Sequence, residues 1–544
     1  MSRDGTTVLE AETVPALLAR RCATEGERRA VVTTDEAVTY AELDRASAAR
    51  AAQLVAGGVV KGDRVALLAP NGIDWAVSAY AALRIGAVLV PLSTLLRPPE
   101  LLAQLTTASV SHLVTVPAFR NRRYLDDLEA AAPGLVGAVR SRARHPAAPA
   151  LRALWRTDGW PPERVPAGLV RALEARVRPA DDLVVLFTSG SRGAPKGVIY
   201  THGAALRAVA AGLQARCVGP GERLYIPMPF FWTGGFSQGL LSTLVAGATL
   251  LTEAEPEPAG TLELLARQRA TLFRGWPDQA TRLAGHPAFA DADLSSLRDG
   301  SLPAVLPPER RPAPGSRANL FGMTETFGTY CGERLDTDLP PGKAGSCGRP
   351  FAGVELRVVD PDRGSELAAG EQGEIWLRGP NLLRGICGRL RSSVFTAEGW
   401  YRTGDLGRLD ADGYLWHAGR LDDMVKVKGA TVYPSEVEAA LRAVGNVRAA
   451  YVTDVPGGDG RPEIAALVVG DVPLEAVRAA LRERLSAFKV PTRWLVTAEP
   501  DAVPLLASGK VDKSALQRLL GDPGSAPEPA GPVEAPGGKH YSTD

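Results

Sequence analysis

Residues 183–202, LVVLFTSGSRGAPKGVIYTH, combine glycines, hydroxyl side chains and a lysine in the way that a phosphate site requires. Glycines let backbone N–H groups approach an anion closely, hydroxyls donate hydrogen bonds to phosphate oxygens, and lysine adds positive charge. The spacing is not that of the GxxxxGK(S/T) loop of NTPases, because Lys196 lies between a proline and a glycine. The stretch also lacks the GxSxG pattern of a nucleophile elbow. The residues expected to face phosphate are Thr188, Ser189, Gly190, Ser191, Arg192, Gly193 and Lys196.

Three later segments carry single residues that a nucleotide site could use. The segment LFGMTET contains Glu325, and a hard cation such as Mg²⁺ prefers oxygen ligands of this kind. YRTGDLGRLDADGYLWHAGR contains Asp405, whose carboxylate can accept strong hydrogen bonds, and PLLASGKVDKSAL contains Lys510. Each feature has an ordinary alternative when taken alone. The glycine-rich loop could be a flexible turn, Thr-Glu a helix cap, Gly-Asp a turn and the lysine a solvated surface residue.

The elements that must position these residues are visible in the apolar pattern. Short apolar runs such as RVALLAP and GAVLVPL alternate with helical stretches such as WAVSAYAALRI. Apolar runs of this length between helices indicate buried parallel strands with crossover helices. We therefore predict an α/β fold in which residues 1–419 form one large N-terminal domain with mostly buried sheets. Residues 133–179, rich in Arg, Ala and Pro, are expected to be a surface excursion.

The pattern changes after Gly419, and a second, smaller domain is expected there. Residues 423–520 contain their own strands, AAYVTDV and EIAALVV, and their own helices, SEVEAALRAV and LEAVRAALRERL. This is a usual size for an α+β domain. Residues 420–422 would then be the hinge between the two domains. Residues 521–544 have too few apolar side chains to fold and are expected to be disordered.

Charge and composition limit the classes of partner. The 544 residues include 62 Lys and Arg against 61 Asp and Glu, which gives no electrostatic reason to expect nucleic acid or an anionic membrane. The chain opens with a polar segment, and no apolar run is long enough to span a bilayer. The five cysteines are scattered, which is typical of reduced thiols in a reducing compartment. These features predict a cytoplasmic protein.

The motifs, in the order in which they occur, resemble the adenylate-forming superfamily, which includes acyl-CoA synthetases, firefly luciferase and the adenylation domains of peptide synthetases. The string TSGSRGAPKG is similar to its signature loop, and the resemblance covers residues from about 10 to 520. It implies that Phe321, with Gly322 beside it, stacks on adenine, that Thr324 contacts phosphate, and that Glu325 and Thr188 hold Mg²⁺. Further implied contacts to the nucleotide are those of Asp405 with ribose and of Arg420.

The same resemblance implies roles for three residues around the smaller domain. Lys510 would drive adenylation, Asp422 would be the pivot of the hinge, and the pantetheine arm of coenzyme A would pass close to Gly429. A carboxylate that attacks the α-phosphate of ATP is an anion approaching an anion, so a metal ion and a lysine matter most in that step. The second step needs neither, and the mobile C-terminal domain is expected to rotate Lys510 away before it.

The acyl pocket is expected along PFFWTGGF, residues 229–236, because a PFFHxGG-like segment borders the acyl pocket in the synthetases that the chain resembles. The segment holds no acidic side chain for an α-amine, which favours a carboxylic acid without that group in an apolar pocket. For Trp232 an aromatic core residue is an equal alternative. The expected lining residues here are Phe231, Trp232, Gly234 and Gly235.

Two departures from the family pattern concern this site. Arg192 stands where the family usually has threonine, and an arginine is still able to hold phosphate. The chain also lacks the usual Gly-Gly-Ala or Gly-Ala-Pro loop upstream of LFGMTET and has SLPAVLPPERRPAPGSRANLFG instead. Leu302, Pro303 and Ala304 are expected to replace that loop. We therefore expect a reshaped pocket that accepts a bulky or unusual acid.

The resemblance favours an ATP-dependent acid–thiol ligase. Such an enzyme converts a carboxylic acid and ATP into acyl-AMP and pyrophosphate, and then transfers the acyl group to coenzyme A. One alternative is a ligase that loads a separate carrier protein, since no carrier domain follows the smaller domain. Another is a member that binds acyl-AMP without adenylating, on account of Arg192 and the altered loop, although Glu325, Asp405 and Lys510 argue against it. A monomer or homodimer is the ordinary expectation.

Overall fold

The structure is a computed structural model that shows two compact units. Unit 1 comprises Met1–Thr403 and Gly407–His417, and unit 2 comprises Gly404–Leu406 and Ala418–Asp544. The residues that the structure describes are 12–160, 162, 165–188, 196–421, 425–427, 430–432, 434–457, 462–485, 489–506 and 510–521. The segment expected to be disordered lies outside them, apart from Gly521.

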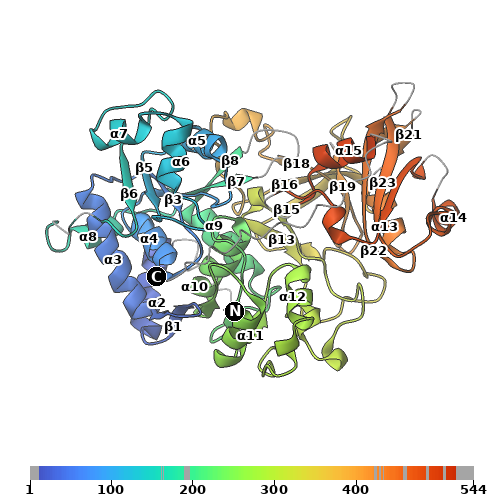
Figure 1. Cartoon of the computed structure of the whole chain (residues 1–544), viewed down its shortest axis with the longest axis horizontal. Coiled ribbons are helices and arrows are strands. Elements are labelled where there is room, and N and C mark those ends of the chain that lie inside the picture. Colours follow the sequence, from blue (N-terminus) through green and yellow to red (C-terminus); the bar gives the residue numbers. More distant parts are fainter. Residues whose placement is uncertain are drawn as a thin grey trace, which may run out of the picture. The chain divides into compact units, whose positions relative to one another are not determined.

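A seven-stranded sheet runs through unit 1 in the order β17-β8-β7-β4-β3-β5-β6 (Figure 1). The five strands from β3 to β7 are parallel, whereas β8 and β17 are antiparallel to their neighbours. Parallel strands need crossover connections, which α4 and α5 supply after β3 and β4. The strands are β3 (Arg64–Leu68), β4 (Val88–Pro91), β5 (His112–Thr115), β6 (Ala153–Arg156), β7 (Asp182–Thr188), β8 (Lys196–Thr201) and β17 (Gly385–Ile386).

Helices cover both faces of this sheet, which explains why its strands read as continuous apolar runs. Successive side chains of a strand point to opposite faces. Val65 and Leu67 of β3 accordingly pack in one apolar cluster with α3 and α4, and Ala66 and Leu68 pack in another with α5 and α6. The helices of this part are α3 (Tyr40–Ala56), α4 (Ile73–Arg84), α5 (Pro98–Thr107), α6 (Tyr124–Ala131), α7 (Leu135–Arg140) and α8 (Leu169–Glu174).

A five-stranded sheet of unit 1 has the order β11-β9-β10-β1-β2, and all its strands except β2 are parallel. The strands are β1 (Arg29–Val32), β2 (Ala37–Thr39), β9 (Arg223–Tyr225), β10 (Thr249–Leu251) and β11 (Leu272–Phe273). The helical segments that belong to this part of the chain are α2 (Val14–Glu25), α9 (His202–Gly212), the π-helix η1 (Gly234–Leu241), α10 (Ser242–Ala246), α11 (Pro258–Arg267), α12 (Pro277–Ala284) and the 3₁₀ turn η2 (Pro287–Phe289).

Two smaller sheets follow, and they carry the LFGMTET and Asp405 motifs. A three-stranded sheet contains β12 (Phe321–Met323), β13 (Gly328–Gly332) and β14 (Arg349–Pro350). A four-stranded sheet contains β15 (Glu355–Val359), β16 (Gln372–Arg378), β18 (Tyr401–Leu409) and β19 (Leu415–Arg420). The 3₁₀ turns of this part are η3 (Pro303–Val305), η4 (Pro308–Arg310), η5 (Thr324–Thr326) and η6 (Arg391–Ser393).

Unit 2 contains a three-stranded sheet with helices on both faces, and the alternation of β23 explains this arrangement. Ile464, Ala466 and Val468 pack with α13 and α14, whereas Ala465 and Leu467 pack with α15 on the other face. The strands of this sheet are β22 (Val447–Pro456), β23 (Pro462–Gly470) and β24 (Arg493–Thr497), and a separate two-stranded sheet consists of β20 (Val425–Val427) and β21 (Ala430–Val432). The helical elements are α13 (Pro434–Arg442), α14 (Leu474–Arg484), the 3₁₀ turn η9 (Pro500–Ala502) and α15 (Lys513–Gly521).

The predicted α/β class is confirmed, but the expectation for residues 133–179 is wrong in part. Strand β6 from this segment pairs with β5 and extends the large sheet, and Leu135, Val139 and Leu151 are buried in the cluster that covers one face. This strand lies in LRALWR, where arginines interrupt the apolar residues, so the sequence shows no continuous apolar run there. None of the helices in the described residues has the length and apolar content that crossing a bilayer demands.

Candidate active site

Strands β7 and β8 pair antiparallel on either side of the predicted phosphate loop. Thr188, the last residue of β7, is paired with Lys196, the first residue of β8, and both side chains are half-buried. These two residues therefore mark the ends of the seven-residue loop between them. The other residues expected to face phosphate, Ser189, Gly190, Ser191, Arg192 and Gly193, lie outside the described residues.

Tyr200 joins strand β8 to the segment LFGMTET. Its side chain is fully buried, and its hydroxyl donates a hydrogen bond to the carbonyl oxygen of Thr324 over 3.1 Å. Burial raises the pKa of Tyr200 well above its usual value, so the phenol remains a neutral donor. The ring also packs on Phe327, with 4.7 Å between centroids. Two predicted nucleotide segments, more than a hundred residues apart in sequence, are thus held together by one side chain.

The turn between β12 and β13 presents Thr324 and Glu325. The hydroxyl of Thr326 donates to the carbonyl oxygen of Gly328 over 2.7 Å, and the amide of Met323 donates to the same hydroxyl over 3.1 Å. Ser237 of η1 fixes the turn from the other side, because its hydroxyl donates to the carbonyl oxygen of Phe327 over 2.6 Å. These bonds give the turn a defined conformation that does not depend on a ligand.

The donor set around Glu325 fits a magnesium ion that is carried by a nucleotide. Glu325 is buried, with 8% of its surface exposed, and the predicted second donor is the hydroxyl of Thr188. Among the described residues, no group of three His, Cys, Asp or Glu side chains is placed to hold a metal ion. Mg²⁺ commonly takes one or two carboxylates from the protein and completes its shell with substrate phosphates and waters. A single buried carboxylate is therefore the expected protein contribution to such a site.

Two further rings contact Phe321, the residue predicted to stack on adenine. The half-buried ring of Phe321 lies 4.4 Å from the ring of His417, with 32° between the planes, and 5.6 Å from the ring of Tyr330. Sequence reasoning missed His417, which is exposed on β19, within the segment expected to bind ribose. A planar adenine is suited to such a surface because stacked rings attract one another. The stacking role of Phe321 remains a prediction.

Asp405 and Arg420, both expected to contact the nucleotide, lie together in unit 2. A guanidinium nitrogen of Arg420 donates to the Asp405 carboxylate over 3.2 Å, and Asp405 is buried with 6% of its surface exposed. Gly404 has a φ of +71°, and a side chain there would lie 3.0 Å from the Arg420 guanidinium. The glycine therefore allows both the turn of the backbone and the approach of the arginine. This pairing orients the carboxylate.

The predicted acyl segment PFFWTGGF meets the LFGMTET turn. The hydroxyls of Thr233 and Thr324 lie 3.5 Å apart, so the segment expected to hold the acid adjoins the one expected to contact phosphate. Gly234 and Gly235 open the π-helix η1, and a side chain on Gly235 would overlap the carbonyl oxygen of Pro229. Single π-helical turns inside helices are frequent at functional sites.

Trp232 packs against a second tryptophan that sequence reasoning missed. The rings of Trp232 and Trp276 meet edge to face with 5.9 Å between centroids, and Phe231 contacts Trp232 in the same manner at 5.2 Å. Trp276 lies directly before α12 and has 37% of its surface exposed. The only signal in the sequence was a tryptophan in the turn GWPDQ, and nothing in its spacing connects it to PFFWTGGF.

The altered loop upstream of LFGMTET is attached to strand β11. The amide of Leu302 donates to the carbonyl oxygen of Phe273 over 3.1 Å, and the amide of Phe273 donates to the Ser301 hydroxyl over 3.2 Å. Leu302 is half-buried in an apolar cluster with α11 and α12, whereas Pro303 is exposed. The connection that follows, residues 306–320, contains the 3₁₀ turn η4 and no α-helix. The effect of this altered loop on the pocket remains a prediction.

Lys510 lies at the end of a tight loop in unit 2. Its side chain is exposed, and its carbonyl oxygen accepts a hydrogen bond from the amide of Leu506 over 2.7 Å. An isolated β-bridge between Leu505 and Val511 closes the same loop. The predicted hinge pivot Asp422 and the predicted pantetheine contact Gly429 lie outside the described residues.

The chain is similar to curated proteins that are named as ligases and synthetases. A 3-[(3aS,4S,7aS)-7a-methyl-1,5-dioxo-octahydro-1H-inden-4-yl]propanoyl:CoA ligase of Mycobacterium tuberculosis is 34% identical over 533 residues, which cover 93% of this chain and 99% of that protein. A feruloyl-CoA synthase of an Amycolatopsis species is 33% identical over 497 residues, which cover 89% of this chain and 94% of the synthase.

A solved structure and a family profile agree with these similarities. The fold is similar to that of ATP-bound MatB from Rhodopseudomonas palustris, with a TM-score of 0.74, 26% identity and coverage of 93% of this chain and 99% of that one. Residues 18–387 match the sequence profile of the family described as AMP-binding enzyme. The predicted superfamily is confirmed: the chain belongs to the AMP-binding enzymes, among relatives that are acyl-CoA ligases and synthetases.

Proposed function

We propose that this chain is an ATP-dependent ligase that joins a ring-bearing carboxylic acid to coenzyme A. In the first step a carboxylate oxygen attacks the α-phosphorus of ATP, the bond to the bridging oxygen breaks, and pyrophosphate leaves. In the second step the sulfur of coenzyme A attacks the acyl carbonyl, and AMP leaves as the thiol loses its proton. Membership in the AMP-binding enzymes, together with the acyl-CoA ligases among its relatives, supports this two-step reaction.

Each step places a different demand on the chain. The first brings two anions together, so positive charge must stabilise the transition state. We assign that task to the ammonium of Lys510 and to Mg²⁺, which Glu325 and Thr188 would hold and which would shield the charge of the phosphates. Asp405 orients the nucleotide by accepting hydrogen bonds from ribose, and Phe321 supports the adenine. The second step requires the thiol to reach the carbonyl, through a path that we place beside Gly429.

The proposed class of acid is inferred mainly from the contact between Trp232 and Trp276. Two indoles that meet edge to face beside Thr233 form a rigid aromatic surface, which favours flat or fused rings over flexible chains. The segment PFFWTGGF has no acidic side chain to pair with an α-amine. The two relatives described above are named for acyl groups that contain rings, an octahydroindene and a feruloyl group.

The test is ATP–pyrophosphate exchange with a panel of acids, combined with mass spectrometry in the presence and absence of coenzyme A. The panel contains a fused two-ring propanoic acid, a phenylpropenoic acid and an unbranched fatty acid of similar carbon number. We expect the ring-bearing acids to give the fastest exchange and to yield acyl-CoA. Replacing Trp276→Ala should lower kcat/KM for these acids about tenfold, because it removes one face of the aromatic surface, whereas Trp276→Phe should retain most of the activity.

The matched control is Trp416→Phe, a substitution of another half-buried tryptophan of unit 1 that packs under Arg408 at 4.2 Å. It should leave the ranking of the acids unchanged. If the unbranched acid is preferred and Trp276→Ala has no effect on ring-bearing acids, the proposed class of acid is wrong. Exchange without acyl-CoA would instead identify a carrier protein as the acceptor.

A further inference from the structure

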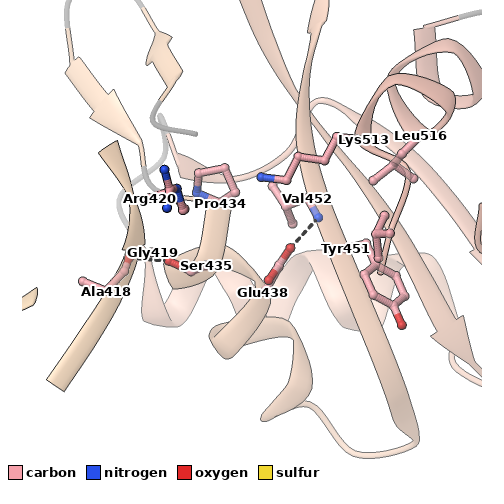
Figure 2. A pocket seen from close by; sticks show the side chains of 11 residues that line it. Ala418, Gly419, Arg420, Pro434, Ser435, Glu438, Tyr451, Val452, Lys513 and Leu516 are labelled. Atoms are coloured by element: carbon pink, nitrogen blue, oxygen red, sulfur yellow. Dashed lines mark hydrogen bonds between the residues drawn. The ribbon is translucent and has the colours of Figure 1, made fainter. Parts of the chain in front are cut away.

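Unit 2 contains a pocket of about 290 Å³ that the roles assigned so far do not explain (Figure 2). Its walls come from the end of β19, the first turns of α13, strand β22 and the start of α15. Arg420 lies at one side of the pocket, whereas Glu438 and Lys513 line its other walls. An enclosed carboxylate and an ammonium group in one small pocket interact more strongly than the same groups in water.

The carboxyl group of Glu438 is held in place in this pocket. Its side chain is 24% exposed, and its carboxylate accepts a hydrogen bond from the amide of Val452 over 3.0 Å, which ties α13 to β22. Arg442, one turn further along α13, lies 3.7 Å from the carboxylate. Burial raises the pKa of Glu438, and the charges of Arg442 and Lys513 act in the opposite direction. The charge of Lys513, at the start of α15, therefore acts on Glu438 of α13.

Lys513 is rigidly connected to Lys510. The loop that carries Lys510 is closed by the Leu505–Val511 bridge and by a hydrogen bond from the amide of Asp512 to the carbonyl oxygen of Pro504 over 2.8 Å. Helix α15 begins at the next residue, Lys513, and the Asp512 carboxylate caps it by accepting from the amide of Ala515 over 3.0 Å. A change in the position of Lys513 therefore moves the loop that presents Lys510.

We propose that Glu438 is a positioning residue for Lys510. Through its attraction for Lys513 it fixes the start of α15 against α13 and β22, and so determines where the preceding loop holds the Lys510 ammonium. Figure 2 shows Glu438 and Lys513 reaching into the pocket from these different elements. A shift of about 1 Å in a group that stabilises a transition state can cost up to about a hundredfold in rate. The inference rests on the proposed role of Lys510 in forming the acyl-adenylate.

The test compares Glu438→Gln and Lys513→Gln with the control Glu436→Gln. Glu436 lies on the same helix and pairs with Lys489 over 2.5 Å, but it does not line the pocket. The two half-reactions are measured separately, acyl-AMP formation by ATP–pyrophosphate exchange and thioester formation from supplied acyl-AMP. We expect both pocket variants to lower kcat for acyl-AMP formation about tenfold. The KM for ATP and the thioester step should stay within about twofold, and the control should resemble the wild type.

A double variant, Glu438→Gln with Lys513→Gln, distinguishes one shared role from two separate ones. Because the two residues act on each other, the double variant should be no slower than the slower single variant. Equal losses in both half-reactions, accompanied by a lower unfolding midpoint, would show a general loss of stability and overturn the inference. The inference is also overturned if the rate losses of the two single variants multiply in the double variant. Unchanged ATP–pyrophosphate exchange in Glu438→Gln would overturn it as well.

Amide hydrogen exchange tests the same coupling without any activity. We expect peptides that contain Leu506 and Asp512 to exchange faster in Glu438→Gln than in the wild type or in Glu436→Gln, because the closing hydrogen bonds of the loop would open more often. Unchanged exchange in these peptides would overturn the inference even if no acid supported catalysis. A different outcome is that the wild-type protein adenylates no acid while Glu438→Gln still shows the faster amide exchange. That combination would contradict the proposed function alone.

Discussion

At the scale of single residues, the paired charges of Asp405 and Arg420 are the best-defined part of the candidate nucleotide site. The carboxylate is buried and partnered, and it is held by a strand rather than a loop. A buried acceptor that is already oriented loses little freedom when it binds two ribose hydroxyls. An ionised acceptor also makes a stronger hydrogen bond than a neutral one. Removing the charge should therefore weaken ATP binding more than it changes the chemistry.

We expect Asp405→Asn to raise the KM for ATP roughly tenfold to a hundredfold, with a smaller effect on kcat. The measurement is ATP–pyrophosphate exchange at saturating acid. Asp410→Asn is the matched control, because Asp410 directly follows the same strand and pairs with Lys343 over 2.6 Å. Its KM for ATP should match that of the wild type. An unchanged KM in Asp405→Asn would remove this residue from the nucleotide site.

The residues that the sequence predicted and those that it missed differ in how they can be recognised. Asp405, Arg420 and the Thr324–Glu325 pair lie inside local motifs, so the resemblance of those motifs to the family could single them out as candidates. Trp276 and His417 acquire partners only through contacts with Trp232 and Phe321, which are distant in sequence. Contacts of this kind depend on how separate elements meet in space. A single sequence contains no information of that sort in its spacing.

At the scale of elements, the anchoring of α2 on α9 depends on a buried histidine. The amide of Val14, the first residue of α2, donates to Nδ1 of His202 over 3.2 Å. His202 begins α9 and is fully buried, and burial lowers its pKa from 6.5 to about 4. The charge of Asp181 raises this pKa slightly, and the charge of Lys61 lowers it. A protonated Nδ1 could not accept the hydrogen bond, so acid should loosen this contact.

We expect the free energy of unfolding to fall on acidification as a result of His202. Because its folded pKa is depressed, the unfolded state takes up the proton first. The contribution is therefore complete above pH 6.5 and is lost between pH 6.5 and about 4, by about 3 kcal/mol in total. In His202→Gln, whose amide oxygen can still accept from Val14, urea unfolding should depend less on pH in this window. An equally steep decline in the variant would assign the acid sensitivity to other groups.

Long elements with a clear period were predictable, and short or irregular ones were not. The helices over WAVSAYAALRI and LEAVRAALRERL and the strand over RVALLAP agree with α4, α14 and β3. The two-residue strand β17 and the π-helix η1 carry no period of their own. They form because β8 offers an edge to β17 and because Gly235 permits close approach to the carbonyl oxygen of Pro229. Tertiary contacts therefore decide these elements.

At the scale of the whole molecule, the two steps of the proposed reaction need different features of the same chain. In this proposal, acyl-AMP formation would need the Lys510 ammonium, whereas thioester formation would need only an open route for the thiol. The two half-reactions should therefore be separable by one substitution in unit 2. The predicted division into residues 1–419, a hinge at 420–422 and a mobile domain at 423–520 remains part of this proposal.

We expect Lys510→Ala to lower the rate of acyl-AMP formation by about a hundredfold or more, because it removes one charge that stabilises the transition state. Thioester formation from supplied acyl-AMP should remain within about threefold of the wild-type rate. Lys489→Ala, which removes an ammonium that pairs with Glu436 elsewhere in unit 2, is the control. Equal losses of both half-reactions in Lys510→Ala would contradict the division of labour proposed for the chain.

The way in which the two units share strands β18 and β19 constrains how such enzymes can be recombined. Residues 404–406 belong to unit 2, yet they are separated from its remainder by residues 407–417 of unit 1. A chimera joined at any point between Asp405 and Arg420 would take the carboxylate from one parent and the guanidinium from the other. Recombination therefore preserves this ion pair only if both parents already carry it, or if the crossover falls before Gly404 or after Arg420. Unless both parents carry the ion pair, residues 404–420 therefore have to be inherited as one block.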